Sequence, residues 1–128
     1  MIGELQRFKA EYLKALAHPV RISILEVLRV SELPVAEIHA QVDPAVANIS
    51  QHLAVLRTAR IVVARKTGPS VLYSVGDPTV FVLLDALRQI FTARLDSMQT
   101  ILATEGQEPT SPDTAPPPPG PLEENANA

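Results

Sequence analysis

Apolar residues in the first sixty positions recur every three or four places, which is the spacing of helices with one buried face. Prolines mark several of the starts, because proline suits a first helical position and the residue before it disfavours the helical conformation. The pattern predicts four helices, at about residues 3–17, from Pro19 onwards, at about 34–41, and from Asp43-Pro44 to about Thr58. Asp43 is expected to cap the fourth of these.

The spacing of apolar residues changes after the fourth predicted helix. Two runs rich in β-branched residues, 61–66 and 71–75, are separated by Thr67-Gly68-Pro69-Ser70 and predict a β-hairpin. Asp77-Pro78 then signals a long fifth helix with an apolar stripe. The expected fold is mostly α with one β-hairpin (α+β), in the order of a winged helix-turn-helix.

The fourth predicted helix carries an unusual set of polar side chains. The side away from its apolar stripe holds four uncharged polar residues, Asn48, Ser50, Gln51 and His52. A helix face that is only solvated more often carries Lys and Glu. Asn and Gln can hydrogen-bond the edge of adenine, and Ser and His can donate to bases or phosphates, so this face is predicted to read DNA.

The net charge of -3 conceals an uneven distribution of charges. Residues 1–104 hold eleven bases and nine acids, whereas residues 105–128 hold five acids and no base. Residues 44–76 contain no acid and four cations, Arg57, Arg60, Arg65 and Lys66. This local charge suits a polyanion such as the phosphates of double-stranded DNA, although charge alone equally fits a solvated surface.

The composition divides the chain into two regions. Residues 1–104 are expected to form one DNA-binding and dimerisation domain. Residues 105–128 form an acidic, proline-rich tail with few large apolar residues, so this tail is expected to be disordered. Such a tail either binds a partner that recognises proline or keeps the protein soluble.

The first and last predicted helices carry more apolar surface than so small a fold can bury. A homodimer built from these two helices would cover it, while the alternative is that both pack on the central core. The residues expected at the dimer interface are Leu5, Phe8, Tyr12, Phe81, Leu84, Phe91, Leu95 and Met98.

Three segments together resemble one known family. LKALAHPVRISILEVLR (13–29), ISQHLAVLRTARIV (49–62) and SVLYSV (70–75) are similar to the ArsR/SmtB family of winged-helix transcriptional repressors, over residues 5 to about 102. The resemblance implies a homodimer joined through the first and last helices, with the fourth helix in the major groove and the wing near the minor groove. It implies that the four polar residues above read bases and that Arg57, Arg65 and Lys66 contact phosphates.

Two positions depart from the family pattern. Arg60 stands where the family usually has glycine, so the turn after the fourth helix is expected to be built differently. Pro69 stands where an arginine is common, which weakens the case for a wing tip that reaches bases. His18, at a helix junction before proline, is expected to be structural.

The metal sites typical of the family are missing their ligands. Residues 32–36 read Glu-Leu-Pro-Val-Ala where two cysteines would serve a soft metal, and the last helix has no histidine. No metal site and no cofactor are therefore expected. The sequence leaves open an unknown small-molecule inducer, a partner protein or control by expression level alone.

These observations favour a sequence-specific DNA-binding repressor on a palindromic operator. The alternative is a winged-helix interaction module that does not bind specific DNA. No catalytic motif is present, so an enzyme is not expected. The N-terminus lacks the apolar run of a signal peptide and no stretch is long enough to span a membrane, so a cytoplasmic protein without a membrane partner is expected.

Overall fold

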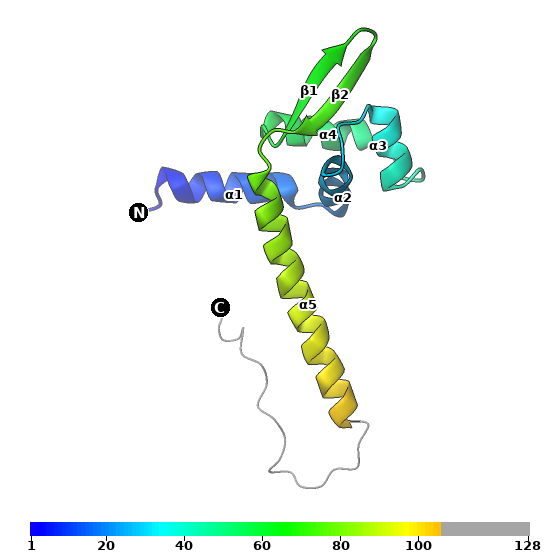
Figure 1. Ribbon diagram of the computed structural model, residues 1–128. Coiled ribbons are helices and arrows are strands. Elements are labelled where there is room, and N and C mark those ends of the chain that lie inside the picture. The colour runs from blue at the N-terminus through cyan, green and yellow to red at the C-terminus, as the bar shows by residue number, and fades with distance from the viewer. Residues whose placement is uncertain (106–128) are drawn as a thin grey trace. The chain divides into compact units, whose positions relative to one another are not determined.

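The computed structural model describes residues 1–105 and has the predicted order of four helices, a hairpin and a fifth helix (Figure 1). The elements are α1 (Glu4–Leu16), α2 (Pro19–Leu28), α3 (Val35–Val42), α4 (Ile49–Thr58), β1 (Val62–Thr67), β2 (Ser70–Val75) and α5 (Thr79–Glu105). The chain divides into two units, the first Met1–Val82 and the second beginning at Leu83 within α5. The predicted tail lies outside the described residues, apart from Glu105, which ends α5.

The core of the first unit lies among α2, α3, α4 and the base of the hairpin. Its most completely buried large side chains are Ile24, Leu25, Ile38, Leu53, Leu56 and Val62. Each such side chain stabilises the fold by about 1.5–3 kcal/mol relative to an exposed one. This packing fixes α4 against α2, α3 and β1, so that one side of α4 is held and the others are presented outward.

The proline signals for α2 and α3 are confirmed. Pro19 is the first residue of α2, and the Nδ1 atom of His18 accepts a hydrogen bond of 3.1 Å from the backbone N–H of Val20. His18 therefore caps α2 with its side chain, which is the structural role expected of it. Pro34 precedes α3, where its fixed φ of -76° prepares the chain for the helix.

The prediction that Asp43-Pro44 starts the fourth helix is wrong. The Oδ1 atom of Asp43 accepts a hydrogen bond from the N–H of Ala45 at 2.9 Å, but the chain forms a turn, and α4 begins only at Ile49. An aspartate before proline supports a local turn with the same hydrogen bond that it would use to cap a helix, so the two outcomes look alike in sequence. Asn48 therefore precedes the helix.

The hairpin is tight and carries a partial third strand. β1 and β2 pair antiparallel from Val62 with Val75 to Thr67 with Ser70, leaving Gly68 and Pro69 as the turn. Gly68 has φ of +60°, a conformation that glycine adopts without strain. Leu33, just before α3, exchanges two backbone hydrogen bonds of 2.8 and 3.0 Å with Tyr73, so the segment that leads into α3 is tied to the wing.

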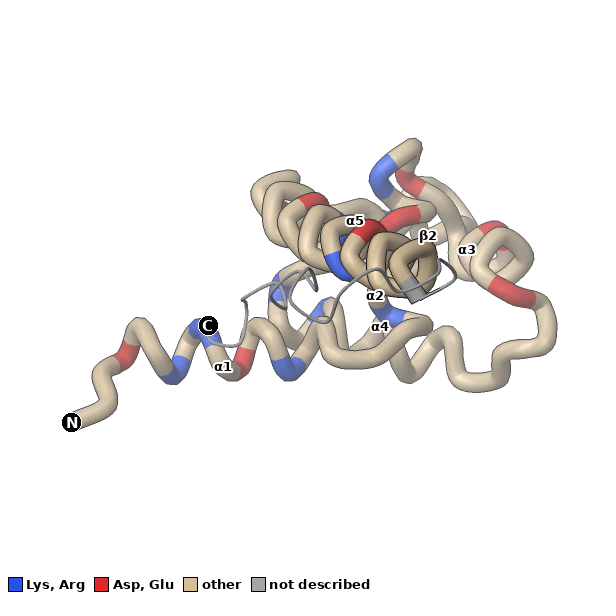
Figure 2. The backbone as a smooth tube through the Cα atoms, turned by 90° about the horizontal axis from the view of Figure 1, so that it is seen from below, with Lys and Arg blue, Asp and Glu red and all other residues tan. Residues whose placement is uncertain are grey.

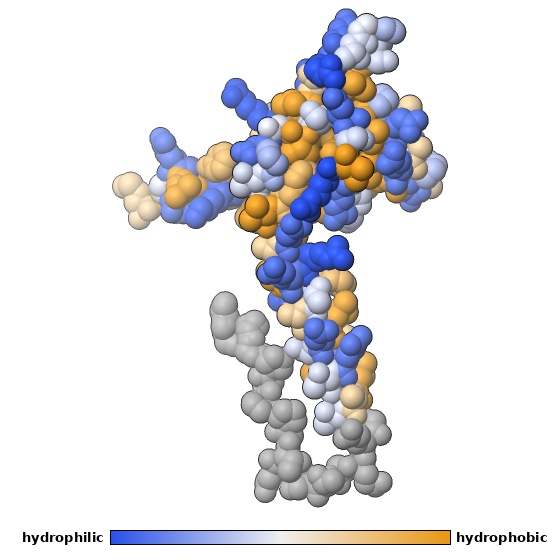
Figure 3. All heavy atoms as spheres, viewed as in Figure 1, coloured by the Kyte–Doolittle hydropathy of each residue, from blue (hydrophilic) through white to orange (hydrophobic). Residues whose placement is uncertain are grey.

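Exposed apolar side chains gather on α1 and on α5, as Figure 3 shows for the visible face of each helix. On α1 the exposed fractions of Leu5, Phe8 and Leu13 are 59%, 63% and 50%. On α5 the exposed large apolar residues are Val82, Leu87, Ile90, Phe91, Leu95, Met98, Ile101 and Leu102. None of the helices in the described part of the chain is both long and apolar enough to cross a membrane.

Candidate nucleic-acid interface

Helix α4 distributes its polar residues over three sides. Ile49, Leu53 and Leu56 are buried and hold the helix to the core. At 100° per residue, Gln51 lies opposite Ile49 and is exposed, with Ser50 and His52 on the two flanks. The four predicted readers therefore do not share one direction, and each has a different environment.

Asn48 is the residue at the N-terminal end of α4. It has φ of 69°, in the left-handed region that asparagine tolerates better than most residues. Its side chain is exposed and makes no capping hydrogen bond with the first turn of α4. The Asn48 amide is thus available at the end of the helix, next to the backbone N–H groups of the first turn.

His52 faces inward rather than outward. Its ring lies 4.3 Å from the ring of His18, centroid to centroid, at an interplanar angle of 41°. The Nδ1 atom of His52 and the Nε atom of Arg21 are buried and lack hydrogen-bond partners among the described residues. Burial, followed by the nearby His18 and Arg21, lowers the pKa of His52 below 6.5. His52 is placed to join α4 to the start of α2, and its predicted role in base reading stays a prediction.

Ser50 lines an open hollow between α4 and β2. The hollow has a volume of about 390 Å³. Its lining residues are Ser50, Leu53, Ala54, Arg57, Thr58 and Tyr73. The five residues from α4 follow helical spacing along the side that faces the wing, while Tyr73 comes from β2.

The four predicted cations differ in what they contact. The Nη2 atom of Arg65 donates to both carboxylate oxygens of Glu32 at 2.8 Å, in an exposed ion pair between β1 and the segment before α3. Arg57 and Lys66 are exposed, and neither forms an ion pair or side-chain hydrogen bond within the described part of the chain. Their charges are open to a partner.

Arg60 adopts φ of 63° directly after α4. The N–H of Arg60 donates to the Arg57 carbonyl and the N–H of Ile61 to the Leu56 carbonyl, both at 2.9 Å. This pair of bonds is the Schellman ending, in which glycine usually takes the left-handed position. The expectation of a differently built turn is therefore wrong, because Arg60 adopts the conformation that glycine favours.

The turn between α3 and α4 is held by a histidine of α3. The Nε2 atom of His39 lies 2.7 Å from the carbonyl oxygen of Val46 and donates to it. This bond joins α3 to the turn that leads into α4 and helps to set the angle between the two helices. Among the described residues no three His, Cys, Asp or Glu side chains gather as metal ligands.

Sequence reasoning missed three residues at this surface. Thr58 could have been found, since it lies at helical spacing from Ser50 and Ala54. Tyr73 and Glu32 could not, because their neighbours on α4 and β1 are distant in sequence and come close only through the docking of the wing.

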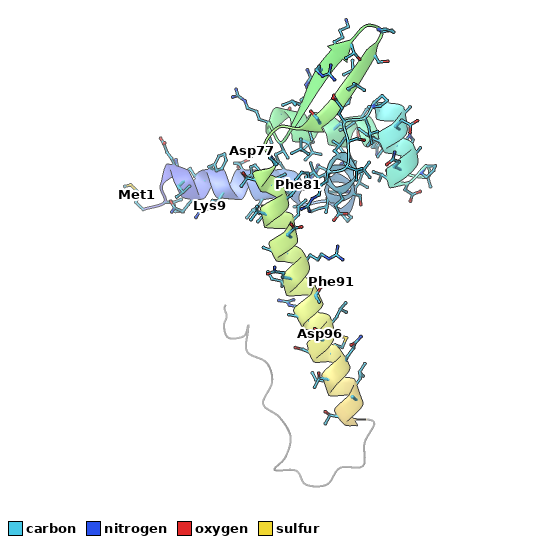
Figure 4. The ribbon with its side chains drawn as sticks, viewed as in Figure 1. Met1, Lys9, Asp77, Phe81, Phe91 and Asp96 are labelled. Atoms are coloured by element: carbon cyan, nitrogen blue, oxygen red, sulfur yellow. The ribbon has the colours of Figure 1, made fainter. Side chains whose placement is uncertain are left out.

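The residues predicted to lie at the dimer interface differ in their exposure. Phe81 and Leu84 are only 9% and 8% exposed in the single chain, and the guanidinium of Arg29 lies 4.8 Å from the Phe81 ring, so these two residues offer little surface to a second copy. Figure 4 marks Phe81 and Phe91 on α5, of which Phe91 is 62% exposed. Along α1, acidic and basic residues are mixed (Figure 2).

Tyr12 differs from the other α1 residues of that set because it is half-buried. Its ring lies 5.8 Å from the ring of Phe8, centroid to centroid. Burial, and then the Asp77 carboxylate, raises the pKa of the Tyr12 phenol above 10.0. Leu5, Phe8, Phe91, Leu95 and Met98 keep exposed surface for a partner.

The sequence of this chain is similar to those of bacterial transcriptional regulators. The family model described as "Bacterial regulatory protein, arsR family" matches residues 18–63, from the start of α2 into β1. An HTH-type transcriptional regulator of Mycobacterium tuberculosis (strain H37Rv) is 38% identical over 99 residues, which cover 77% of this chain and 87% of that protein. The biofilm growth-associated repressor of Agrobacterium fabrum is 37% identical over 81 residues, covering 63% and 69% of the two chains.

Two solved structures share the fold. The crystal structure of a Mycobacterium tuberculosis protein has a TM-score of 0.65 at 38% identity and covers 75% of this chain and 98% of that chain. A homodimeric winged helix-turn-helix DNA-binding domain of Mycobacterium bovis, solved in solution, has a TM-score of 0.64 at 26% identity and covers 72% and 85%. The fold around α4 and the hairpin is therefore a winged helix-turn-helix.

Proposed function

Because this chain belongs to the ArsR family of bacterial regulatory proteins, we propose that it is a homodimeric repressor that binds a palindromic operator in the cytoplasm. The relatives are named as transcriptional regulators and repressors, and one structural neighbour is named as a homodimeric DNA-binding domain. In this proposal α4 enters the major groove and the hairpin lies along the neighbouring minor groove.

The observation that carries the proposal is the set of exposed, uncharged polar residues at the start of α4, together with exposed cations on α4 and β1 that form no ion pair among the described residues. Asn48 and Gln51 present amides that can hydrogen-bond N6 and N7 of adenine, and Ser50 adds a hydroxyl. Arg57 in the last turn of α4 and Lys66 on β1 form no ion pair among the described residues, so their charges can neutralise phosphates. Base reading and phosphate binding are thus assigned to different side chains.

The dimer follows from the apolar surfaces of α1 and α5. Phe8 on α1 and Phe91 on α5 are each more than three-fifths exposed, which is costly on a monomer. A two-fold dimer would place two copies of α4 at two half-sites, so the operator is expected to be a palindrome whose half-site centres are about one helical turn apart or a multiple of it.

Selection of bound sequences from a random DNA pool tests the proposal. We expect one palindromic sequence to be enriched by the full chain, with binding that weakens steeply as salt increases. Gln51→Ala should relax the preference at one base pair per half-site and cost about 1–3 kcal/mol in discrimination. Gln99→Ala, an exposed glutamine on α5, is the matched control and should leave the preference unchanged.

A chain that enriches no sequence would support the interaction-module alternative. Repression is tested separately in cells, by a reporter placed behind the selected operator. Expression should fall when the protein is present and recover with the Gln51→Ala variant.

A further inference from the structure

We propose that the hollow between α4 and β2 is a binding site for one phosphodiester group of the DNA backbone, and that Thr58 and Tyr73 act there together with Arg57. The proposal rests on the function proposed above and adds to it a site that neither the charge pattern nor the comparisons assign. The hollow has a volume of about 390 Å³ and is partly open to solvent.

The lining of the hollow has the chemistry that a phosphodiester requires. Three hydroxyl residues, Ser50, Thr58 and Tyr73, and one guanidinium residue, Arg57, surround it, while no acid does. Hydroxyl and guanidinium groups are among the usual donors to backbone phosphates. Leu53 and Ala54 form the apolar remainder of the wall, which leaves space between the polar groups.

The position of the hollow matches the course of a DNA strand. The major and minor grooves of a duplex are separated by the sugar-phosphate backbone. If α4 occupies the major groove and the wing lies along the minor groove, one backbone must pass between α4 and β2. The hollow lies between those two elements, so a phosphate there would be approached from both sides.

The lining groups are held in place before DNA arrives. Leu53 is 1% exposed and fixes the helix that carries Ser50, Arg57 and Thr58. Tyr73 is fixed through its backbone, which exchanges two hydrogen bonds with Leu33. Arg57 makes no ion pair in the described part of the chain, unlike Arg65, whose guanidinium is engaged by Glu32. Arg57 is thus the cation best placed to serve this phosphate.

Tyr73→Phe and Arg57→Gln test the site by different signatures. Tyr73→Phe removes one neutral donor, so affinity should fall about tenfold for all sequences, specific or not, with the salt slope unchanged. Arg57→Gln should lower the affinity and also reduce the salt slope by about 0.9 for each protomer. Ser31→Ala also removes one neutral hydroxyl, from an exposed residue between α2 and α3 outside the hollow, and should leave DNA binding unchanged.

Operators with a single neutral methylphosphonate in place of one phosphate locate the contact. At one position per half-site this change should lower the affinity of the wild-type protein for the operator. The same change should have little further effect on the affinity of the double variant Tyr73→Phe/Arg57→Gln. Thermal unfolding of each variant checks that the fold is intact, and Thr58→Val provides a second neutral substitution in the hollow.

The outcomes separate this proposal from the proposed function. Wild-type protein that binds a selected operator, with Tyr73→Phe and Thr58→Val indistinguishable from it, overturns the phosphate site alone. Wild-type protein that binds no specific DNA overturns the function as well. Inorganic phosphate that binds in a Tyr73-dependent manner, yet displaces DNA no more than chloride of equal ionic strength, would assign the hollow to a free anion and overturn the backbone contact.

Discussion

Arg60 stores backbone strain at the end of the recognition helix. Its φ of 63° lies in the left-handed region, where a residue with a Cβ costs about 1–2 kcal/mol more than glycine. Arg60→Gly should therefore raise the free energy of unfolding by about 1 kcal/mol, seen as a rise of several degrees in Tm. Arg60→Ala loses the same charge but keeps the Cβ. If Arg60→Ala stabilised the protein equally, strain would not be the cause.

Glu32 restrains a second residue predicted to contact DNA. Its carboxylate binds Arg65 with both oxygens at 2.8 Å, and a phosphate would compete for the same guanidinium. Since both side chains are well exposed, Glu32→Gln should tighten DNA binding only modestly, by about two- to fivefold. The affinity is measured by fluorescence anisotropy at fixed salt.

Two controls isolate the Glu32–Arg65 contact from general charge repulsion. Glu37→Gln removes an exposed carboxylate from the first turn of α3 and should change the affinity less. In an Arg65→Gln background the effect of Glu32→Gln should disappear. An effect that persists there would mean that Glu32 repels DNA directly.

At the scale of elements, the contact between the start of α2 and α4 links the stability of the fold to pH. His18 and Arg21 from α2 are the charged or titratable groups that act on His52, and together with burial they hold the pKa of His52 below 6.5. An unfolded chain therefore binds more protons than the folded chain as pH falls below about 6.5. Stability is fully present above that pH and is lost as pH falls through the lowered pKa.

When the pH is lowered from 7.5 to 5.5, we expect the denaturation midpoint of the wild-type protein to decrease. The decrease should be larger than that of His52→Gln, which lacks the titrating ring. Parallel losses in the two proteins would assign the acid sensitivity to carboxylates elsewhere. His18→Asn keeps a side chain that can cap α2 but removes the ring next to His52. This variant should therefore lose less stability than the wild type between pH 7.5 and pH 5.5.

The elements were predictable where one local signal decides them. Pro19 and Pro34 marked helix starts, and the change of apolar spacing after Thr58 marked the hairpin, because both effects act within a few residues. The start of α4 was predicted wrongly at Asp43, because its carboxylate accepts the same hydrogen bond in a turn as in a helix cap. The direction of His52 and the partner of Arg65 depend on packing between distant segments, which periodicity does not encode.

At the scale of the whole molecule, we expect the proposed dimer, joined through the exposed apolar surfaces of α1 and α5, to be needed for tight binding of the operator. A single α4 contacts one half-site, whereas a dimer joins two such contacts, so the second binds at a high effective concentration. Phe91 is 62% exposed on α5 and belongs to the surface proposed for the partner. Phe91→Glu would place an unpaired charge in that interface.

Phe91→Glu should therefore yield a folded monomer whose affinity for the full palindrome falls by at least a hundredfold, towards its affinity for one half-site. Light scattering after size exclusion gives the mass, and anisotropy with full and half operators gives the affinities. Gln89→Glu adds the same charge at an exposed polar position of α5 and should remain dimeric. A Phe91→Glu protein that stays dimeric would show that the dimer interface does not include Phe91. A Phe91→Glu protein that is monomeric, yet binds the full palindrome as tightly as the wild type, would show that DNA binding does not require the dimer.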